Sequence, residues 1–149
     1  MQENILQGID SYELSVNQRN LWSLHESGAA VFYNQVLIQL DNSVQENDLQ
    51  EAIQAVIQKN ETLLFKAVKD ASLLYPKQYI DQTNTLEFHT AEKTGESTHT
   101  LADRHLGYAY DIFNNMPVRC CYVTSENSKE LVVRIYSFWA DSYLSLIHI

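Results

Sequence analysis

The sequence predicts an α+β fold in which mixed strands and helices form a two-layer α/β sandwich. Three observations predict it. Apolar residues recur at helical spacing between Leu49 and Ile57, which indicates one long amphipathic helix. Two apolar runs, 118–124 and 131–138, flank a short polar loop, which is typical of a β-hairpin. The elements follow in the order helix, strand, long helix, several strands, helix and hairpin, with the helices expected on one face of a mixed sheet.

The first helix and strand have clear local signals. Ser15 followed by Gln18 fits a capping box, so a helix is expected from Val16 to Ser27, with Gly28 placed to end it. The run 32–40 then reads as a strand with one apolar face, which carries Phe32, Val36, Ile38 and Leu40.

The middle of the chain predicts the long helix and several short strands. A second capping box over 43–46 is expected to start the helix, which should end near Lys59 and Asn60. Its apolar side carries Leu49, Ala52, Ile53, Val56 and Ile57. Strands are expected over 63–68, weakly over 72–80 around Pro76, and over 86–89, followed by a polar loop over 91–98.

The last third predicts a helix and the hairpin. A helix is expected over 100–110, with Leu101, His105 and Tyr108 on one side, and a turn over 114–117. Cys120 and Cys121 are adjacent on the first hairpin strand, so their side chains should point to opposite faces and stay reduced.

Composition excludes several classes of function. The 149 residues carry 10 basic and 19 acidic side chains, and the formal net charge of −9 argues against nucleic-acid binding. No apolar run reaches the roughly 18 residues of a membrane span. The N-terminus has neither a basic n-region nor an apolar h-region, so we expect no secretory signal and a cytoplasmic chain.

The histidines do not form a metal-binding pattern. His99 and His105 are six residues apart, where a helical pair of ligands would be four apart, and no cysteine or third histidine follows at ligand spacing. We therefore expect no metal site.

Five short motifs follow one another along the chain. They read Leu14-Ser15-x-x-Gln18-x-x-Leu21-Trp22, then Tyr33-Asn34, then the long helix with Lys59-Asn60-Glu61-Thr62-Leu63, then Tyr110-Asp111-Ile112 with Pro117-Val118-Arg119, and last Tyr136-Ser137-x-x-x-Asp141-Ser142. The series resembles the condensation domains of nonribosomal peptide synthetases. Their motifs are S-x-A-Q-x-R-L-W, a Y-N strand, R-H-E-x-L-R-T, F-D-L-x-x-G-P-L-x-R and H-H-x-x-x-D-G. Each match is weak alone, but five in order over residues 11–143 are a specific signal.

The resemblance implies the N-terminal half of a chloramphenicol-acetyltransferase-like fold. In such domains, two similar halves enclose a tunnel in which an amine attacks a thioester and an amide bond forms. The substrates arrive on phosphopantetheine arms of carrier proteins, so no cofactor is bound directly. The implied partners are acyl or peptidyl carrier proteins, an adjacent adenylation domain and a C-terminal half.

The last motif departs from the family at the positions that carry the chemistry. The second, catalytic His of the signature aligns with Ser137, the first with Tyr136, and the Gly with Ser142. A neutral imidazole accepts a proton near pH 7, whereas an unassisted serine hydroxyl is a far poorer base. Ser137 is therefore either an altered centre that still positions substrate or part of an inactive site kept as scaffold.

Asp141 is retained, and the resemblance implies a structural role for it. In the family this Asp pairs with the Arg of R-H-E-x-L-R-T, a position that Leu64 occupies here. Asp141 would then cap the next helix, face solvent or pair elsewhere.

The resemblance leaves two functions open. One is a condensation domain that has lost its activity, and the other is a scaffold or docking module that recruits carrier or adenylation domains. Related acyltransferase or epimerisation domains also rely on the His signature, so its loss counts equally against them.

The last six residues, 144–149, break the expected pattern and match what a common sequencing adapter encodes. We expect residues 11–143 to be an incomplete N-terminal subdomain and this tail to be non-native.

Overall fold

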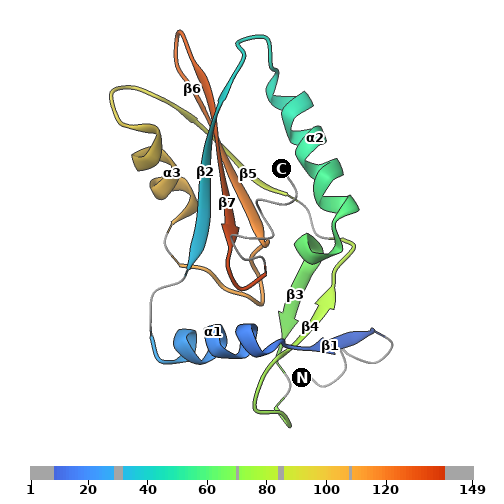
Figure 1. Cartoon of the computed structure of the whole chain (residues 1–149). Helices are drawn as coiled ribbons and strands as arrows, with labels where there is room; N and C mark the ends of the chain where they lie inside the picture. Colours follow the sequence, from blue (N-terminus) through green and yellow to red (C-terminus); the bar gives the residue numbers. More distant parts are fainter. Residues whose placement is uncertain (1–8, 29–31, 70, 84–85, 108, 140–149) are drawn as a thin grey trace.

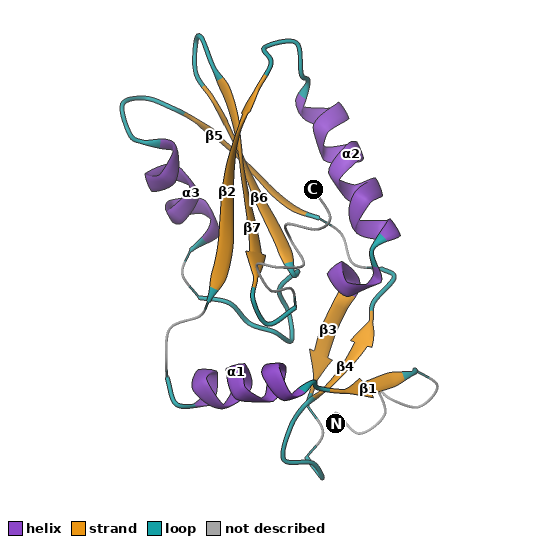
Figure 2. Ribbon diagram, in the orientation of Figure 1, coloured by secondary structure: helices purple, strands orange, loops and turns teal. Residues whose placement is uncertain are grey.

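A computed structural model describes residues 9–28, 32–69, 71–83, 86–107 and 109–139. It contains two sheets and three α-helices (Figures 1 and 2). In chain order the elements are β1 (Ser11–Glu13), α1 (Val16–Glu26), β2 (Tyr33–Leu40), α2 (Glu46–Lys59), the 3-10 helix η1 (Glu61–Leu64), β3 (Phe65–Val68), β4 (Lys77–Ile80), β5 (Glu87–Glu92), α3 (Thr98–Leu106), β6 (Val118–Thr124) and β7 (Lys129–Tyr136). Within these residues no helix is long and apolar enough to cross a membrane.

The larger sheet is mixed, as the sequence predicts. Its strand order is β2-β7-β6-β5. β7 pairs antiparallel with both β2 and β6, whereas β5 pairs parallel with β6. The predicted hairpin of β6 and β7 is confirmed, and the backbone N–H of Ser125 closes its loop on the carbonyl of Ser128 at 2.8 Å.

Apolar clusters fill both faces of this sheet. On one face, Ile57 of α2 belongs to a cluster with Cys120, Tyr122 and Leu131. On the other face, α3 contributes Leu101, Ala102 and Leu106 to a cluster with Cys121, Val123 and Val132. The mixed α/β class is confirmed, but α2 and α3 lie on opposite faces rather than on one (Figure 2).

The adjacent cysteines lie on these opposite faces, as predicted. Both are free and fully buried. Burial raises the pKa of the Cys120 thiol to about 12, so it stays protonated at neutral pH.

A second, smaller layer lies beside one end of the mixed sheet. The strands β1, β4 and β3 form a three-stranded antiparallel sheet next to α1 (Figure 1). The α1 capping box is confirmed: the Ser15 hydroxyl accepts from the Gln18 N–H at 3.2 Å, and the Gln18 side chain accepts from the Ser15 N–H at 2.9 Å.

The second predicted capping box is wrong. The N-cap of α2 is Gln45, and it makes no side-chain capping bond. Ser43 instead donates both its N–H and its hydroxyl to the carboxylate of Asp41, at 2.8 and 2.6 Å. Asp41 closes this local turn before the helix begins, so Ser43 is spent outside it.

Several other element boundaries shift. Leu63 and Leu64 lie in η1 rather than in the strand, and of the predicted strand pair around Pro76 only β4 forms in the described residues. The strand β5 extends to Glu92, and α3 begins at Thr98 and ends at Leu106, where Gly107 adopts a positive φ of 66°. His105, predicted on the apolar side of that helix, is exposed, and Tyr108 lies outside the described residues.

Candidate functional site

The site predicted from the sequence lies where β7 ends and a turn begins. Three backbone hydrogen bonds fix it: Tyr136 N–H donates to the Pro117 carbonyl at 3.1 Å, Ser137 N–H to the Phe32 carbonyl at 3.0 Å, and Trp139 N–H to the Tyr136 carbonyl at 3.0 Å. The first two bonds come from segments on either side of β7. The backbone that carries Ser137 is therefore held in place by its neighbours.

Tyr136 is buried in an aromatic stack. Its ring, 1% exposed, lies 3.6 Å from the Tyr110 ring at an interplanar angle of 14° and meets Tyr33 edge-on at 6.0 Å. Trp139 donates its indole N–H to the Tyr110 hydroxyl at 2.6 Å. Burial raises the pKa of Tyr110, so this phenol stays neutral. These contacts make Tyr136 a packed structural side chain.

A buried charged network holds the Tyr136 hydroxyl. That hydroxyl accepts from Arg119 Nη1 at 3.1 Å, and Arg119 Nη2 lies 2.6 Å from Glu87 Oε1. The same Glu87 oxygen lies 3.0 Å from His89 Nε2. Arg119 Nε has no partner among the described residues, although it is buried. The network runs from half-buried Glu87 and His89 to the fully buried end of β7.

Ser137 is half-buried, and no base lies beside it in the described part of the chain. The structure shows its N–H bonded to Phe32 but no bond from its hydroxyl to an imidazole or carboxylate there. The position that would supply the family's arginine holds Leu64, which is 0% exposed in an apolar cluster with Ile57 and Leu86. Asp141 and Ser142 lie outside the described residues, so their roles stay predictions.

Gln18 links α1 to the junction, a role that the capping pattern did not reveal. Its amide nitrogen donates to the Phe138 carbonyl at 3.1 Å and to Gln78 Oε1 at 2.9 Å. Gln78 in turn donates to the Glu13 carbonyl at 3.0 Å. One side chain thus ties α1, the smaller sheet and the turn after β7 together. These partners are 60 and 120 residues away, beyond the reach of local sequence patterns.

Arg134 is the second residue that the sequence reasoning passed over. It is 0% exposed, and it donates to Asp103 Oδ1 and the Gly107 carbonyl of the α3 end, both at 2.7 Å, and to Gln35 Oε1 on β2. Its guanidinium lies 4.1 Å from the centre of the Tyr33 ring. A charged residue inside a strongly apolar strand was the available signal, since such a charge requires buried partners.

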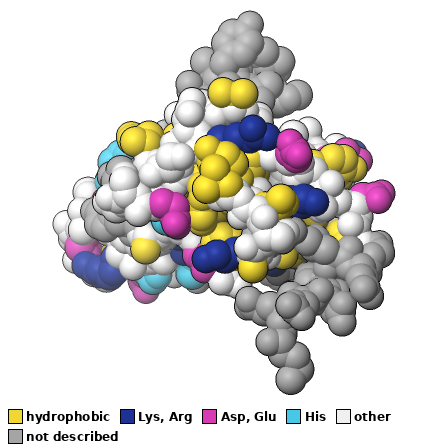
Figure 3. All heavy atoms as spheres, turned by 90° about the horizontal axis from the view of Figure 1, so that it is seen from below, with side chains coloured by type: hydrophobic (Ala, Val, Ile, Leu, Met, Phe, Trp, Pro, Cys, Tyr) yellow, Lys and Arg dark blue, Asp and Glu magenta, His cyan; other side chains and the backbone are white. Residues whose placement is uncertain are grey.

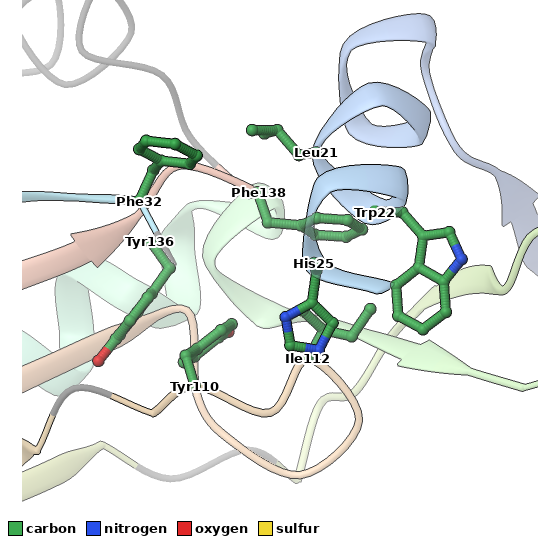
Figure 4. Close-up of a pocket in the computed structure, with 8 residues that line it drawn as sticks. All are labelled: Leu21, Trp22, His25, Phe32, Tyr110, Ile112, Tyr136 and Phe138. Carbon is green, nitrogen blue, oxygen red and sulfur yellow. The ribbon is translucent and has the colours of Figure 1, made fainter. Parts of the chain in front are cut away.

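A small apolar pocket opens beside the junction. Figure 4 shows side chains of α1 facing those of β7 and of the segment before β6 across it. It is lined by Leu21, Trp22, His25, Phe32, Tyr110, Ile112, Tyr136 and Phe138. Its volume of about 30 Å³ is room for one or two waters, so the pocket alone cannot hold an acyl or aminoacyl substrate.

A larger groove of about 290 Å³ lies on the end of the molecule formed by α1 and the smaller sheet. It is lined by Glu13, Leu14, Arg19, Leu73, Leu74, Tyr75, Pro76 and Lys77. Seen from below, this end exposes apolar side chains among Lys, Arg and acidic groups (Figure 3). The groove does not include Tyr136, Ser137 or Phe138, so it is separate from the junction.

The histidines make other contacts. His99 Nδ1 lies 3.1 Å from Gln35 Nε2, and the rings of His89 and His105 are 6.1 Å apart. Across the described residues, no three His, Cys, Asp or Glu side chains gather as a metal site would require.

The fold matches solved structures, although no protein-family model and no curated protein matches the sequence. The X-domain from teicoplanin biosynthesis is 23% identical, with a TM-score of 0.70 over 86% of this chain and 28% of that one. A variant of the starter condensation domain of rhizomide synthetase is 13% identical, with a TM-score of 0.75 over 89% and 32%. The cyclization-docking bidomain of a nonribosomal peptide synthetase from Sorangium cellulosum is 15% identical, with a TM-score of 0.63 over 86% and 27%.

These likenesses define the fold. The mixed sheet, the smaller sheet and the three helices match the N-terminal half of a chloramphenicol-acetyltransferase-like fold. More specifically, it is the fold of condensation-type domains of nonribosomal peptide synthetases. The chain spans about a third of the length of the structures it matches.

Proposed function

We propose that this chain is the N-terminal part of a synthetase condensation domain that no longer catalyses condensation. The observation that carries the proposal is the end of β7. There a serine follows a tyrosine that is locked between Tyr110 and Arg119, in the fold of condensation-type domains. The family reaction would join two carrier-bound acyl groups through an amide bond.

The chemistry of that reaction explains the expected loss. An attacking amine must lose a proton, and a group with a pKa near 7 accepts it efficiently. Ser137 has no such pKa and no activating base among its described neighbours. Tyr136 is engaged by the Arg119 guanidinium on the packed α3 side of the sheet, so it does not replace the imidazole.

The alternative is a scaffold or docking module that recruits carrier or adenylation domains. The preserved packing around the altered junction favours it, because Phe138 and Trp139 are buried and the Gln18 link is intact. A chain that had lost every role would not need this arrangement. Phosphopantetheine would then be presented by a carrier protein rather than held by this chain.

The test uses the full-length gene product with two loaded carrier proteins, and amide product is measured by mass spectrometry. We expect no product from the natural protein or from Ser137→Ala. Condensation at rates usual for such domains, lost in Ser137→Ala, would contradict the proposal and make Ser137 catalytic.

The docking alternative is tested by binding. The same gene product is titrated with phosphopantetheine-loaded carrier protein and with the neighbouring adenylation domain, with an unrelated acidic protein as control. Saturable binding to either domain without turnover is expected. No affinity for both would exclude the docking role.

A further inference from the structure

The strand β2 is an open edge of the mixed sheet. Within the described residues it has one hydrogen-bonded neighbour, β7, over the full register from Tyr33–Tyr136 to Leu40–Lys129. Three consecutive apolar side chains are well exposed: Val36 at 46%, Leu37 at 37% and Ile38 at 41%. Because successive side chains alternate, both faces of the edge are apolar.

The edge lacks the protection that sheets ordinarily carry. β2 contains no charged residue, glycine or proline. The other three strands of the sheet all carry charges, and the opposite edge, β5, has Glu87 and Glu92. Charges, proline and bulges are the devices that stop edge strands from pairing, so a long uncharged edge is a template for another strand.

The strand is also complementary to itself. If a second β2 pairs antiparallel about a two-fold axis through Leu37, Val36 lies opposite Ile38 on the α2 side of the sheet. On the α3 side, Leu37 lies opposite its own copy, and Gln35 lies opposite Gln39. Apolar pairs and amide pairs thus meet their own kind, which is what a closed two-fold interface requires.

Charge favours a second copy at this edge rather than elsewhere on the surface. Two chains of net charge −9 repel each other, and a strand without charges is a place where they meet without adding a like-charge pair. We propose that two copies of this chain associate through β2 and form one continuous eight-stranded sheet. The proposal does not depend on the function proposed above.

The first test is the mass of the full chain in solution across a concentration series, by sedimentation velocity. We expect a monomer–dimer equilibrium in the micromolar range, because one strand pair buries a small interface. The double variant Val36→Lys with Ile38→Lys should stay monomeric, since it would place lysines opposite each other. Val56→Lys replaces an equally exposed valine on α2, away from the edge, and should dimerise as the natural chain does.

A monomer at every concentration, or a dimer that survives the double substitution, would overturn the proposal. Loss of the dimer in Val56→Lys would also overturn it, because that residue is outside the edge. Circular dichroism confirms that the variants are folded before their masses are compared.

The second test fixes the register and needs a milder change. Leu37→Cys should form an intermolecular disulfide under mild oxidation, because directly opposed residues lie within disulfide distance. Gln39→Cys should not, because its copy would be roughly 13 Å away along the strands. The native cysteines are buried and should give little background. Equal cross-linking of both variants, or of neither, would contradict the register.

Discussion

Arg119 and Arg134 lie directly opposite each other on β6 and β7, in the interior of the sheet. Like charges at opposed positions destabilise a sheet unless each has its own partner. Here Glu87 pairs with Arg119 and Asp103 with Arg134, from two different elements. Each pair also reaches a functional or structural end of the molecule: Arg119 bonds Tyr136, and Arg134 bonds the end of α3.

Replacing Arg119 tests the support of the junction. Arg119→Met removes the bonds to Tyr136 and Glu87 and should lower the free energy of unfolding by about 2–3 kcal/mol. The measurement is urea unfolding followed by tryptophan fluorescence, which also reports on Trp139. Arg104→Met is the control, because it breaks an ion pair with Glu96 on the surface and should leave the urea midpoint unchanged. Equal midpoints for the two variants would show that the buried network contributes nothing.

Glu87 should make stability depend on pH. Burial raises the pKa of Glu87, but hydrogen bonds from Arg119 and His89 outweigh it and leave the pKa below the ordinary 4.5. A depressed carboxyl pKa stabilises the fold above the pKa of the unfolded chain, and this contribution is lost as the pH falls through the folded value. Stability should therefore fall between about pH 5 and pH 3.

The variant Glu87→Gln isolates this contribution. It should be less stable than the natural chain at pH 7 and should lose less stability on acidification. Thermal unfolding at a series of pH values measures both. If the two proteins lose stability in parallel, Glu87 is not the group responsible.

At the scale of elements, Gln18 separates local from tertiary stabilisation of α1. Gln18→Glu keeps an acceptor for the Ser15 N–H but loses the donor to Phe138 and Gln78. Ser15→Ala removes the cap alone and should cost about 1 kcal/mol. Gln18→Glu should cost about 1–2 kcal/mol more than that, because it leaves the part-buried Phe138 carbonyl unpaired. Equal losses in chemical unfolding would mean that the link to the turn is unimportant.

The long helix α2 buries a narrower stripe than its sequence predicts. Ile57 is 1% exposed, whereas Val56, assigned to the same apolar side, is 56% exposed. Ile57→Ala should cost about 2–4 kcal/mol through lost packing. Val56→Ala should change stability by less than about 0.5 kcal/mol. Similar losses for both variants, measured by urea midpoint, would place Val56 in the core after all.

Local signals predicted elements better than they predicted surfaces. The α1 cap and the β6–β7 hairpin are specified by a few neighbouring residues, and both are confirmed. Alternation alone gave β2 an apolar face, but at this edge Val36 and Ile38 are exposed. Which face a strand buries depends on distant elements, and so do the partners of Arg119 and Gln18.

At the scale of the whole molecule, three apolar clusters join the elements. Two cover the faces of the mixed sheet, and the third surrounds the junction, where Trp22, Tyr110 and Trp139 pack together. The candidate site therefore lies at the meeting point of the mixed sheet, the smaller sheet and α1. Motif order predicted that the junction would be central, while its aromatic stack and charged network emerged from the fold alone.

The central claim is that this fold is one part of a condensation-type domain. The most direct measurement is a long sequencing read of the genomic locus, continued past the codon for Tyr143. We predict that the reading frame departs from residues 144–149 and continues into a second half, with carrier and adenylation domains after it. A genomic stop codon directly after Ile149 would contradict the account and leave a free-standing chain without condensation chemistry.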